Sequence, residues 1–271
     1  MGPHPLFVSH GAPDLAIAAH PAGRFLDGLR AEFATASAVL VVSAHYQRTH
    51  PTLASRHGHR IVHDYRGFDP VLRDVSYAPP EAPELVELTE TLLNRAALSF
   101  ERTAMRPLDH GAWVPLVRAD PEARLPVAQL SLGMGDAHAH LALGRALQPL
   151  RDAGVLVLGS GSFTHGLPDI RRWEESDAGA PDWVREFAQW SATRLDAGAE
   201  SELLEWMTQA PHAQRNHPTP EHFLPLFVTM GAAGENWHAE QLHRSISREV
   251  LALDAWRFAP SAQGCSSSSG T

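Results

Sequence analysis

The sequence predicts an α/β fold, a single domain in which a central, mostly parallel or mixed β-sheet is flanked by helices. Short apolar runs without polar alternation, typical of strands that are covered on both faces, recur along the chain. Longer segments with a helical apolar face separate them, and the connections are short. We expect the domain to span residues 1–260 and a disordered polar tail to follow over residues 261–271 (SAQGCSSSSGT).

The expected strands are apolar runs bounded by turn residues. In chain order they cover residues 5–10 (PLFVSH), 37–46 (SAVLVVSAHY), 125–132 (LPVAQLSL) and 155–162 (VLVLGSGS), and the last strand is expected within residues 247–258 (SREVLALDAWRF). Helices are expected over residues 20–33, 79–98, 140–154, 181–195, 200–210 and 218–234. Gly154 is expected to end the third of these helices, and Thr219 to cap the last, with Pro220 in its first turn.

Composition and charge narrow the classes of function. The 271 residues include 22 basic and 31 acidic ones, a formal net charge of -9, which argues against a nucleic-acid or anionic-membrane partner. Every basic residue is arginine, which excludes a P-loop lysine and a Schiff-base lysine. The one cysteine, Cys265, allows neither an internal disulfide nor a thiolate metal cluster. The chain start is not typical of a signal peptide and no apolar run would span a membrane, so we expect a reducing cytoplasm. The oligomeric state stays open, a homo-oligomer included.

Histidine is the unusual residue, with 17 copies in the chain. Most of them are expected in loops or at the surface, although histidine is also the commonest metal ligand. Ligands of open α/β sheets bind beyond the carboxyl ends of the strands. His10 and His45 follow the first two expected strands and His165 follows the fourth, so the three converge if these strands run parallel. Neutral imidazoles that meet at one point form a site for zinc or ferrous iron.

Two further histidines lie in distinctive local sequences. His110 (LDHGAWVPL) is expected in a shaped loop near Trp113, and the alternative is a loop histidine packed under that tryptophan. His222 (TPEHFLPL) is expected in the first turn of a helix, whose positive end disfavours imidazolium and leaves a neutral ring that can bind a cation. The alternative for His222 is a solvent-facing side chain. A spare histidine beside a metal would supply acid–base catalysis near neutral pH.

Other catalytic motifs have little support. Residues 159–163 (GSGSF) lack the spacing of a dinucleotide-binding loop and are expected to form a tight turn. The sequence contains neither the G-x-S-x-G elbow of a serine hydrolase at this position nor an H-E-x-x-H metalloprotease motif.

Seven motifs in chain order carry a resemblance to a known family. They are FVSHGAP, VVSAHYQ, LDHGAWVPL, PVAQLSL, LGSGSFTHGL, HPTPEHFLPL and LDAWRF, from about Pro5 to Phe258. Together they resemble the class III extradiol ring-cleavage dioxygenases of the LigB-like superfamily, in the branch similar to 4,5-DOPA dioxygenase. The resemblance implies an α/β fold around a mixed sheet and one non-haem divalent metal at the strand ends. Fe(II) is implied for activity, with Zn(II) as the alternative, and a small catecholic substrate and O2 are the implied partners.

The resemblance also implies roles for single residues. His10, His45 and His222 resemble the metal ligands, and Glu221 is the alternative to His222. His165 resembles an active-site histidine that is a fourth ligand in some members and the acid–base residue in others. In the acid–base role it would take a proton from the catechol and return it as the ring opens.

Substrate contacts are implied for a second set of residues. His110 resembles a histidine that supports the site or contacts the substrate, and it would donate a hydrogen bond to an oxygen of O2 or of the substrate. Tyr46 and Trp113 are expected to contact the substrate beside it. Arg48 and Arg66 are available for a substrate carboxylate.

Departures from the family leave the substrate open. Ser162 and Gly166 stand where the family often has asparagine, and residues 252–254 (ALD) lack a serine of the family pattern. Two other classes of function remain as alternatives. A zinc hydrolase would use the same histidines to activate water. A non-catalytic metal-binding protein on the same fold is disfavoured by the presence of His165.

Overall fold

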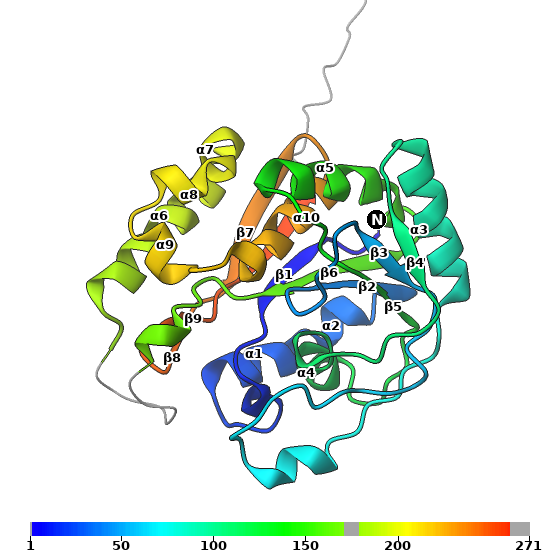
Figure 1. The fold of residues 1–271 in the computed structure, drawn as a ribbon, viewed down its shortest axis with the longest axis horizontal. Helices are drawn as coiled ribbons and strands as arrows, with labels where there is room; N and C mark the ends of the chain where they lie inside the picture. Colours follow the sequence, from blue (N-terminus) through cyan, green and yellow to red (C-terminus); the bar gives the residue numbers. More distant parts are fainter. Residues whose placement is uncertain (1, 171–178, 261–271) are drawn as a thin grey trace, which may run out of the picture.

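The four expected apolar runs form the centre of a mixed β-sheet (Figure 1). They are β1 (Leu6–Ser9), β2 (Ala38–Ser43), β5 (Val127–Leu130) and β6 (Val155–Gly161). These strands run parallel, in agreement with the predicted mostly parallel or mixed sheet, and their order, which was not predicted, is β5-β2-β6-β1. The computed structural model describes residues 2–170 and 179–260, and the expected tail over residues 261–271 with Cys265 lies outside the described residues.

Further strands extend the sheet at both edges. β3 (Thr52–Ala54) and β4 (Glu101–Thr103) lie beyond β5, and β10 (Ala255–Pro260) and β7 (Trp237–His243) lie beyond β1. Among them, the sequence did not predict β3, β4 and β7. The pairs β3–β5, β1–β10 and β10–β7 are antiparallel, which makes the sheet mixed. The expected last strand corresponds to β10, and β8 (Ile246–Ser247) pairs with β9 (Leu251–Ala252) in a separate hairpin. Edge strands were missed because they are short or polar.

The buried residues of β2 show why its sequence lacks polar alternation. Leu40 and Val42 belong to the hydrophobic core on one face of the sheet, whereas Val39 and Val41 belong to the core on the other face. Successive side chains of a strand point to opposite faces, so a strand covered on both sides is apolar throughout.

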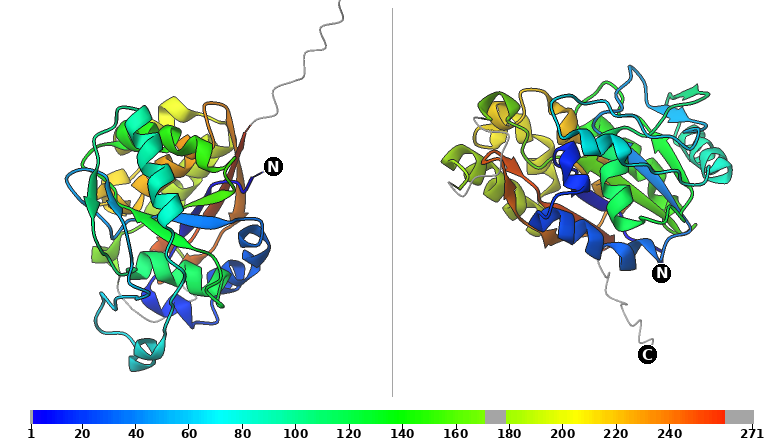
Figure 2. Two further views of the ribbon diagram at one scale, coloured as in Figure 1. Left: turned by 90° about the vertical axis from the view of Figure 1, so that its right-hand side faces the viewer. Right: turned by 90° about the horizontal axis from the view of Figure 1, so that it is seen from below.

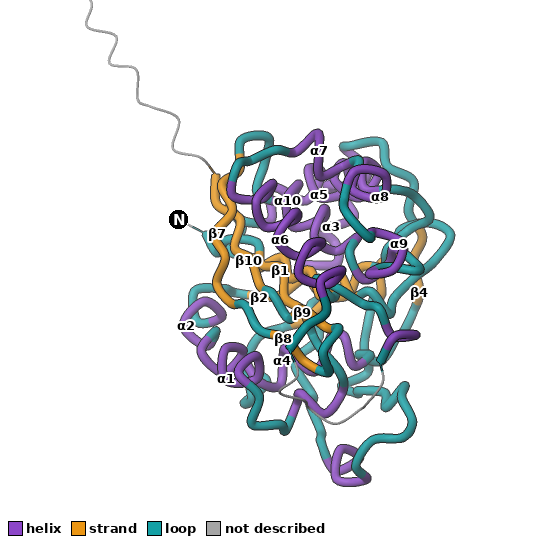
Figure 3. The backbone as a smooth tube through the Cα atoms, turned by 90° about the vertical axis from the view of Figure 1, so that its left-hand side faces the viewer, coloured by secondary structure: helices purple, strands orange, loops and turns teal. Residues whose placement is uncertain are grey.

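Helices cover both faces of this sheet (Figures 1 and 3). One layer contains α3 (Pro83–Arg95), α5 (Ala137–Leu147) and α10 (Leu224–Ala232), with α6 (Asp182–Asp196), α7 (Glu200–Leu204), α8 (Trp206–Gln209) and α9 (Ala213–Asn216) beside it. The other layer contains α1 (Pro21–Gly28), α2 (Arg30–Phe33) and α4 (His110–Ala119). Single 3-10 turns are η1 (Pro13–Ala16), η2 (Pro70–Asp74), η3 (Gln148–Leu150), η4 (Leu167–Asp169) and η5 (Pro220–His222). Within the described ranges, no helix has the length and apolar character needed to cross a membrane.

Several helix boundaries differ from the prediction. The helices expected over residues 20–33 and 200–210 are each divided in two, and the one expected over residues 140–154 begins earlier because Asp136 caps α5. The helix expected over residues 218–234 begins as η5 and continues as α10. Thr219 precedes η5, but its hydroxyl donates to Glu221 (2.9 Å) and does not cap a backbone N–H.

The sequence also missed helix α4. His110, expected in a loop, is its first residue, and the Asp109 carboxylate caps the helix by accepting from the N–H of Ala112 at 3.1 Å. Gly111 and Pro115 concealed it, since both residue types are unfavourable in helix interiors.

A long connection leads from β3 to α3 and stands out from the body of the molecule, with η2 in it (cyan in Figures 1 and 2). It passes the N-terminus of α4, where Ile61 forms a β-bridge with Leu108. This connection supplies a residue to the site described next.

Candidate metal centre

The carboxyl ends of adjacent parallel strands bring the first two predicted histidines together. β1 and β2 flank β6 in the sheet, His10 directly follows β1, and His45 lies two residues beyond β2. Their Nε2 atoms are 3.1 Å apart. The structure therefore places His10 and His45 as the strand-end argument predicts, and their role as ligands stays a prediction.

His222 reaches the same point from η5. Its Nε2 lies 3.3 Å from Nε2 of His45. The GSGSF segment, expected as a tight turn, instead forms the end of β6 and the residues just after it. A Cβ on Gly161 would overlap the carbonyl oxygen of His222, so glycine is what allows η5 to approach β6. The N–H of Ser162 then donates to that carbonyl at 2.8 Å and holds η5 in place.

The separations of the His45 Nε2 atom from those of His10 and His222 suit a single divalent metal. Nitrogen ligands about 2.1 Å from an ion are about 3.0 Å apart at right angles and about 3.4 Å apart at tetrahedral angles. The separations of 3.1 and 3.3 Å lie between these values.

A hydrogen-bond chain determines which nitrogen of His10 carries the proton. Pro115 has no N–H, so the carbonyl of Gly111 one helical turn earlier in α4 has no helical donor. The hydroxyl of Ser160 donates to that carbonyl instead. The Ser160 oxygen must then accept from Nδ1 of His10, which is 3.1 Å away. Nδ1 of His10 is therefore protonated, and Nε2, which lies 3.1 Å from Nε2 of His45, has the lone pair.

Glu221 has the same effect on His222. Its Oε1 lies 3.0 Å from Nδ1 of His222, and a carboxylate can only accept there. Metal-bound histidines commonly donate their second N–H to a carboxylate in this way. The arrangement favours His222 as the ligand and makes Glu221 its hydrogen-bond partner.

The electrostatics keep these rings neutral. Burial, followed by the neighbouring histidines, lowers the pKa of His10 and of His222 well below the usual value. The pKa of His45 is lowered from 6.5 to about 4, mainly by burial. Because neutral imidazole is the form that binds a metal, the three residues fit a divalent ion both in geometry and in protonation.

His165 packs flat against His222. The ring centroids are 3.4 Å apart and the ring planes differ by 13°. In-plane lone pairs of two parallel rings run side by side and do not converge on one ion. This geometry favours the acid–base role of His165 over that of a fourth ligand. Burial lowers its pKa to about 3, so the ring is unprotonated at neutral pH.

His110 lies against the cluster from the side of α4. Its ring centroid is 3.9 Å from that of His45 and 5.5 Å from that of His10. Its Nδ1 lies 2.8 Å from Oδ1 of Asp64, a residue that the sequence analysis missed. Since the Nδ1–H group donates a hydrogen bond to that carboxylate, neutral His110 has a lone pair but no proton at Nε2. The predicted donation from His110 to an oxygen of O2 or substrate therefore requires that Nε2 first take up a proton.

Trp113 is fully buried, with 0% of its surface exposed. Its indole N–H donates to the carbonyl of Val62 at 3.1 Å, and the N–H of Val62 donates to the carbonyl of Leu108 at 2.8 Å. Trp113 therefore anchors the long connection to α4. The predicted contact with substrate stays a prediction that this burial does not favour.

Tyr46 is buried as well, with 1% of its surface exposed. The guanidinium of Arg106 lies 3.9 Å from the centre of its ring. Arg48 and Arg66, considered for a substrate carboxylate, are both exposed, and Arg48 lies 5.3 Å from the Tyr46 ring. The roles of these residues in substrate binding stay predictions.

The backbone of His45 is held by residues that the sequence analysis also missed. Its N–H donates to the hydroxyl of Ser43 at 3.2 Å, and that hydroxyl donates to Oδ1 of Asp109 at 2.7 Å. Arg106 donates to the carbonyl of His45 at 3.1 Å and pairs with Asp109 at 2.8 Å. The serine that precedes His45 in SAH was the visible signal, but its partners lie more than 60 residues away along the chain.

A second group of potential ligands, His57, His59 and Glu81, does not offer a comparable site. Nδ1 of His57 accepts from the N–H of His59 at 3.1 Å. Nε2 of His57 lies 3.3 Å from the carbonyl of Pro80 and 3.4 Å from Glu81, so it is the donor. Because both ring nitrogens of His57 are engaged in hydrogen bonds, the ring has no lone pair for a metal. These three residues instead stabilise the local backbone conformation.

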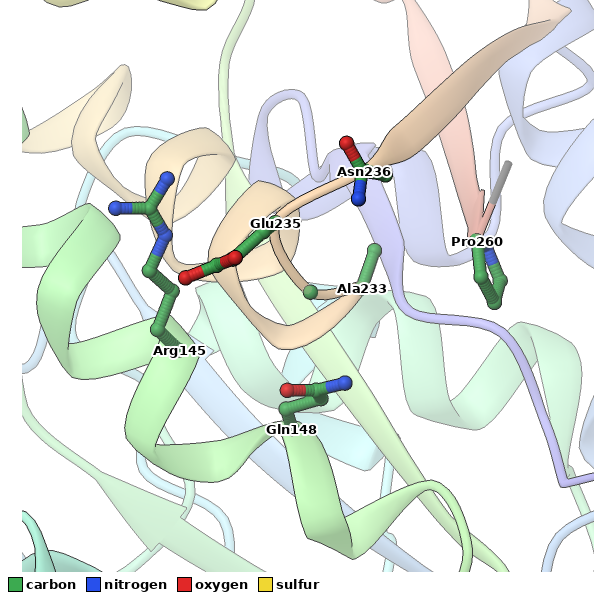
Figure 4. Close-up of a pocket in the computed structure, with 7 residues that line it drawn as sticks. Arg145, Gln148, Ala233, Glu235, Asn236 and Pro260 are labelled. Carbon is green, nitrogen blue, oxygen red and sulfur yellow. The ribbon is translucent and has the colours of Figure 1, made fainter. Parts of the chain in front are cut away.

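A cavity elsewhere in the described chain contains none of the predicted site residues (Figure 4). It has a volume of about 510 Å³ and lies at the end of α5 and α10. Its lining residues are Arg145, Gln148, Ala233, Gly234, Glu235, Asn236 and Pro260.

Comparison with known proteins agrees with the histidine geometry. Residues 26–252 match the family described as the catalytic LigB subunit of aromatic ring-opening dioxygenase, and the chain belongs to this family. It is therefore an aromatic ring-opening dioxygenase.

Individual relatives carry a more particular name. A protein of Beta vulgaris named 4,5-DOPA dioxygenase extradiol is 40% identical over 260 residues, which cover 93% of this chain and 95% of the relative. A protein of the same name from Portulaca grandiflora is 35% identical over 258 residues, which cover 93% and 94%. The crystal structure of an uncharacterized protein from Escherichia coli K12 has a TM-score of 0.77 at 24% identity, covers 93% of this chain and 98% of its own, and shows the shared fold.

Proposed function

We propose that the enzyme performs extradiol cleavage of a catechol that carries a DOPA-like side chain, with Fe(II) as its metal and O2 as the second substrate. The observation that carries the proposal is the convergence of three neutral Nε2 atoms at 3.1 and 3.3 Å, with two further histidine rings beside them. The names of the relatives support the substrate class. A cytoplasmic setting and the oligomeric state stay predictions.

The metal would be held by His10, His45 and His222. When bound, the metal would supply the redox chemistry by which a catechol and O2, held at the same centre, react with each other. Ser160 and Glu221 keep two of these rings in the tautomer that binds a metal. Because His10 and His222 are only 2% and 3% exposed, the centre lies in a position from which water is largely excluded.

Proton transfer is assigned to His165. Burial lowers the pKa of His165 to about 3, so at neutral pH the ring is neutral and one ring nitrogen has a lone pair that is available to a catechol hydroxyl. His110 faces the same region with the Nε2 lone pair and accepts a hydrogen bond from a hydroxyl placed there. Cleavage of the ring bond beside the two hydroxyl-bearing carbons would give a muconic semialdehyde-type product.

The test is anaerobic reconstitution with Fe(II) and, separately, with Zn(II), followed by addition of oxygen and a panel of catechols that includes L-DOPA. We expect oxygen uptake and a new yellow chromophore with Fe(II) only, and their loss in His45→Ala. Stoichiometric metal binding without uptake on any catechol would refute the ring-cleavage proposal. Hydrolysis by the zinc form without O2 would instead favour a zinc hydrolase, which an all-histidine ligand set also suits.

A further inference from the structure

We propose that Asp64 is a positioning residue that determines how His110 faces the metal centre. The expected effect on turnover rests on the proposed function, whereas the expected effect on the orientation of the His110 ring rests on the geometry alone. A single oxygen, Oδ1 of Asp64, accepts from the backbone N–H of His110 at 3.2 Å and from its ring Nδ1 at 2.8 Å. Two hydrogen bonds to one carboxylate oxygen restrict both the position of the first turn of α4 and the rotation of the ring.

The carboxylate of Asp64 is ionised in this setting. Burial is the largest single effect and raises its pKa, but the hydrogen bonds from the ring and backbone of His110, together with the charge interactions with His110 and His45, outweigh it, and the net pKa lies below the usual value. The carboxylate also lies at the N-terminus of α4, where the helix dipole stabilises a negative charge. An ionised carboxylate accepts only, so the ring proton of His110 stays on Nδ1 and Nε2 is the acceptor.

The same arrangement occurs at two of the proposed ligands. The Nδ1–H of His10 donates to Ser160 and that of His222 donates to Glu221, and the Nε2 atom of each ring lies beside Nε2 of His45. His110 is the third ring fixed this way, and one of its ring nitrogens lies within 4.8 Å of ring nitrogens of His10 and His45. Asp64 thus does for His110 what Glu221 does for His222.

The anchoring by Trp113 explains how a surface connection can hold Asp64 with this accuracy. Val62, two residues before Asp64, is bound to Leu108 through its N–H and to Trp113 through its carbonyl. Both partners belong to α4 or to the residues just before it, so Asp64 and His110 are fixed to the same helix. The Asp64 side chain is 27% exposed, so without this anchor it would exchange His110 for water.

The consequence for the reaction is a fixed hydrogen-bond acceptor beside the metal. A substrate hydroxyl near His45 would donate to Nε2 of His110, which orients the catechol without a change in metal binding. Loss of the partner that orients a metal-bound histidine typically reduces metal affinity or activity 10- to 100-fold, and we expect a loss of about that size for the histidine beside the metal. Here the loss should fall on turnover, because His110 is not one of the three proposed ligands.

The test compares Asp64→Ala, Asp64→Asn and, as a matched control on the same connection, Asp69→Asn. Asp69 caps η2 through the N–H of Val71 at 2.9 Å, and an asparagine oxygen can accept the same bond. The first readout is the ¹⁵N NMR signature of the His110 ring in the metal-free protein. We expect the Nδ1–H tautomer of His110 in the parent and in Asp69→Asn, and a mixture of the two tautomers in Asp64→Ala. Asp64→Asn should give a mixture closer to the parent, because the amide oxygen is still an acceptor but has no charge.

The second readout is kcat and KM for oxygen uptake on L-DOPA in Fe(II)-loaded protein of measured iron content. We expect Asp64→Ala to lower kcat about 10- to 100-fold with unchanged iron stoichiometry, and Asp64→Asn to recover part of the loss. The proposal is wrong if Asp64→Ala keeps both the ring form and the kcat of the parent. If the alanine variant does not fold, the same comparison is made with Asp64→Asn. If the parent shows no uptake on any catechol, the proposed function fails, and the NMR comparison still decides the role of Asp64.

Discussion

Replacement of Ser160 by alanine should break the chain that connects Pro115 to His10. Ser160 is fully buried, and its hydroxyl is both the donor to the Gly111 carbonyl and the acceptor for Nδ1 of His10. Alanine leaves two buried polar groups without a partner, at a cost of about 1–3 kcal/mol each, less where water enters. The His10 ring is then free to adopt the other tautomer, whose Nε2–H cannot bind a metal.

The expected effect of Ser160→Ala is therefore a lower metal affinity by roughly 10- to 100-fold, in addition to a lower stability. The control is Ser162→Ala in the same part of the chain. Ser162 is also buried and its hydroxyl donates to the carbonyl of Thr164 at 2.6 Å, but it contacts none of the proposed ligands through that bond. Its loss should lower stability by about 1–3 kcal/mol and leave metal affinity unchanged.

The assay is a competition titration of Zn(II) against a chromophoric chelator, with thermal unfolding measured on the same metal-free samples. Reduced affinity in Ser160→Ala alone, with reduced Tm in both variants, would support the hydrogen-bond chain. Equal metal affinity in the two variants would show that Ser160 does not control the tautomer of His10.

Three further predictions concern the same centre. Glu221→Gln should weaken metal binding about 10- to 100-fold, and His222→Ala should remove stoichiometric metal binding. Equilibrium dialysis measures both, and an equal loss of metal affinity in the two variants would show that Glu221 is itself a ligand. Gly161→Ala should displace η5 from β6, lower the free energy of unfolding by about 1–3 kcal/mol and release the bound metal. Urea unfolding and metal analysis measure these two effects, and a metal content equal to that of the parent would contradict the prediction. The metal-free protein should lose stability as the pH falls from about 6.5 towards 4, because His45 has a folded pKa of about 4 against the usual 6.5 and the unfolded chain binds the proton more tightly. Urea unfolding at pH 7 and pH 5 checks this, with a contribution of up to about 1.4 kcal/mol per pH unit for each such histidine, and equal stability at the two pH values would count against it.

The central strands and two strand-end histidines were predictable because they depend on local pattern. A strand buried on both faces must be apolar throughout, so β1, β2 and β6 are visible as runs in the sequence. The carboxyl ends of parallel strands lie at one edge of the sheet, and β1 and β2 are separated there only by β6, so the proximity of His10 and His45 follows from their positions after these strands. The outer strands have no comparable pattern: β4 is exposed and polar, and β7 alternates at the edge of the sheet.

What only the tertiary structure decided is the set of groups that orient the histidines. Asp64 lies 46 positions from His110, and Ser160 lies 150 positions from His10. Neither pairing has a sequence period or a spacing, because a side-chain hydrogen bond depends on where two segments pack and not on how far apart they lie in the chain. The helix that carries His110 was hidden for a related reason. Pro115 is unfavourable in an isolated helix, and it is accommodated in α4 because Ser160, from a distant strand, satisfies the carbonyl that the proline leaves free.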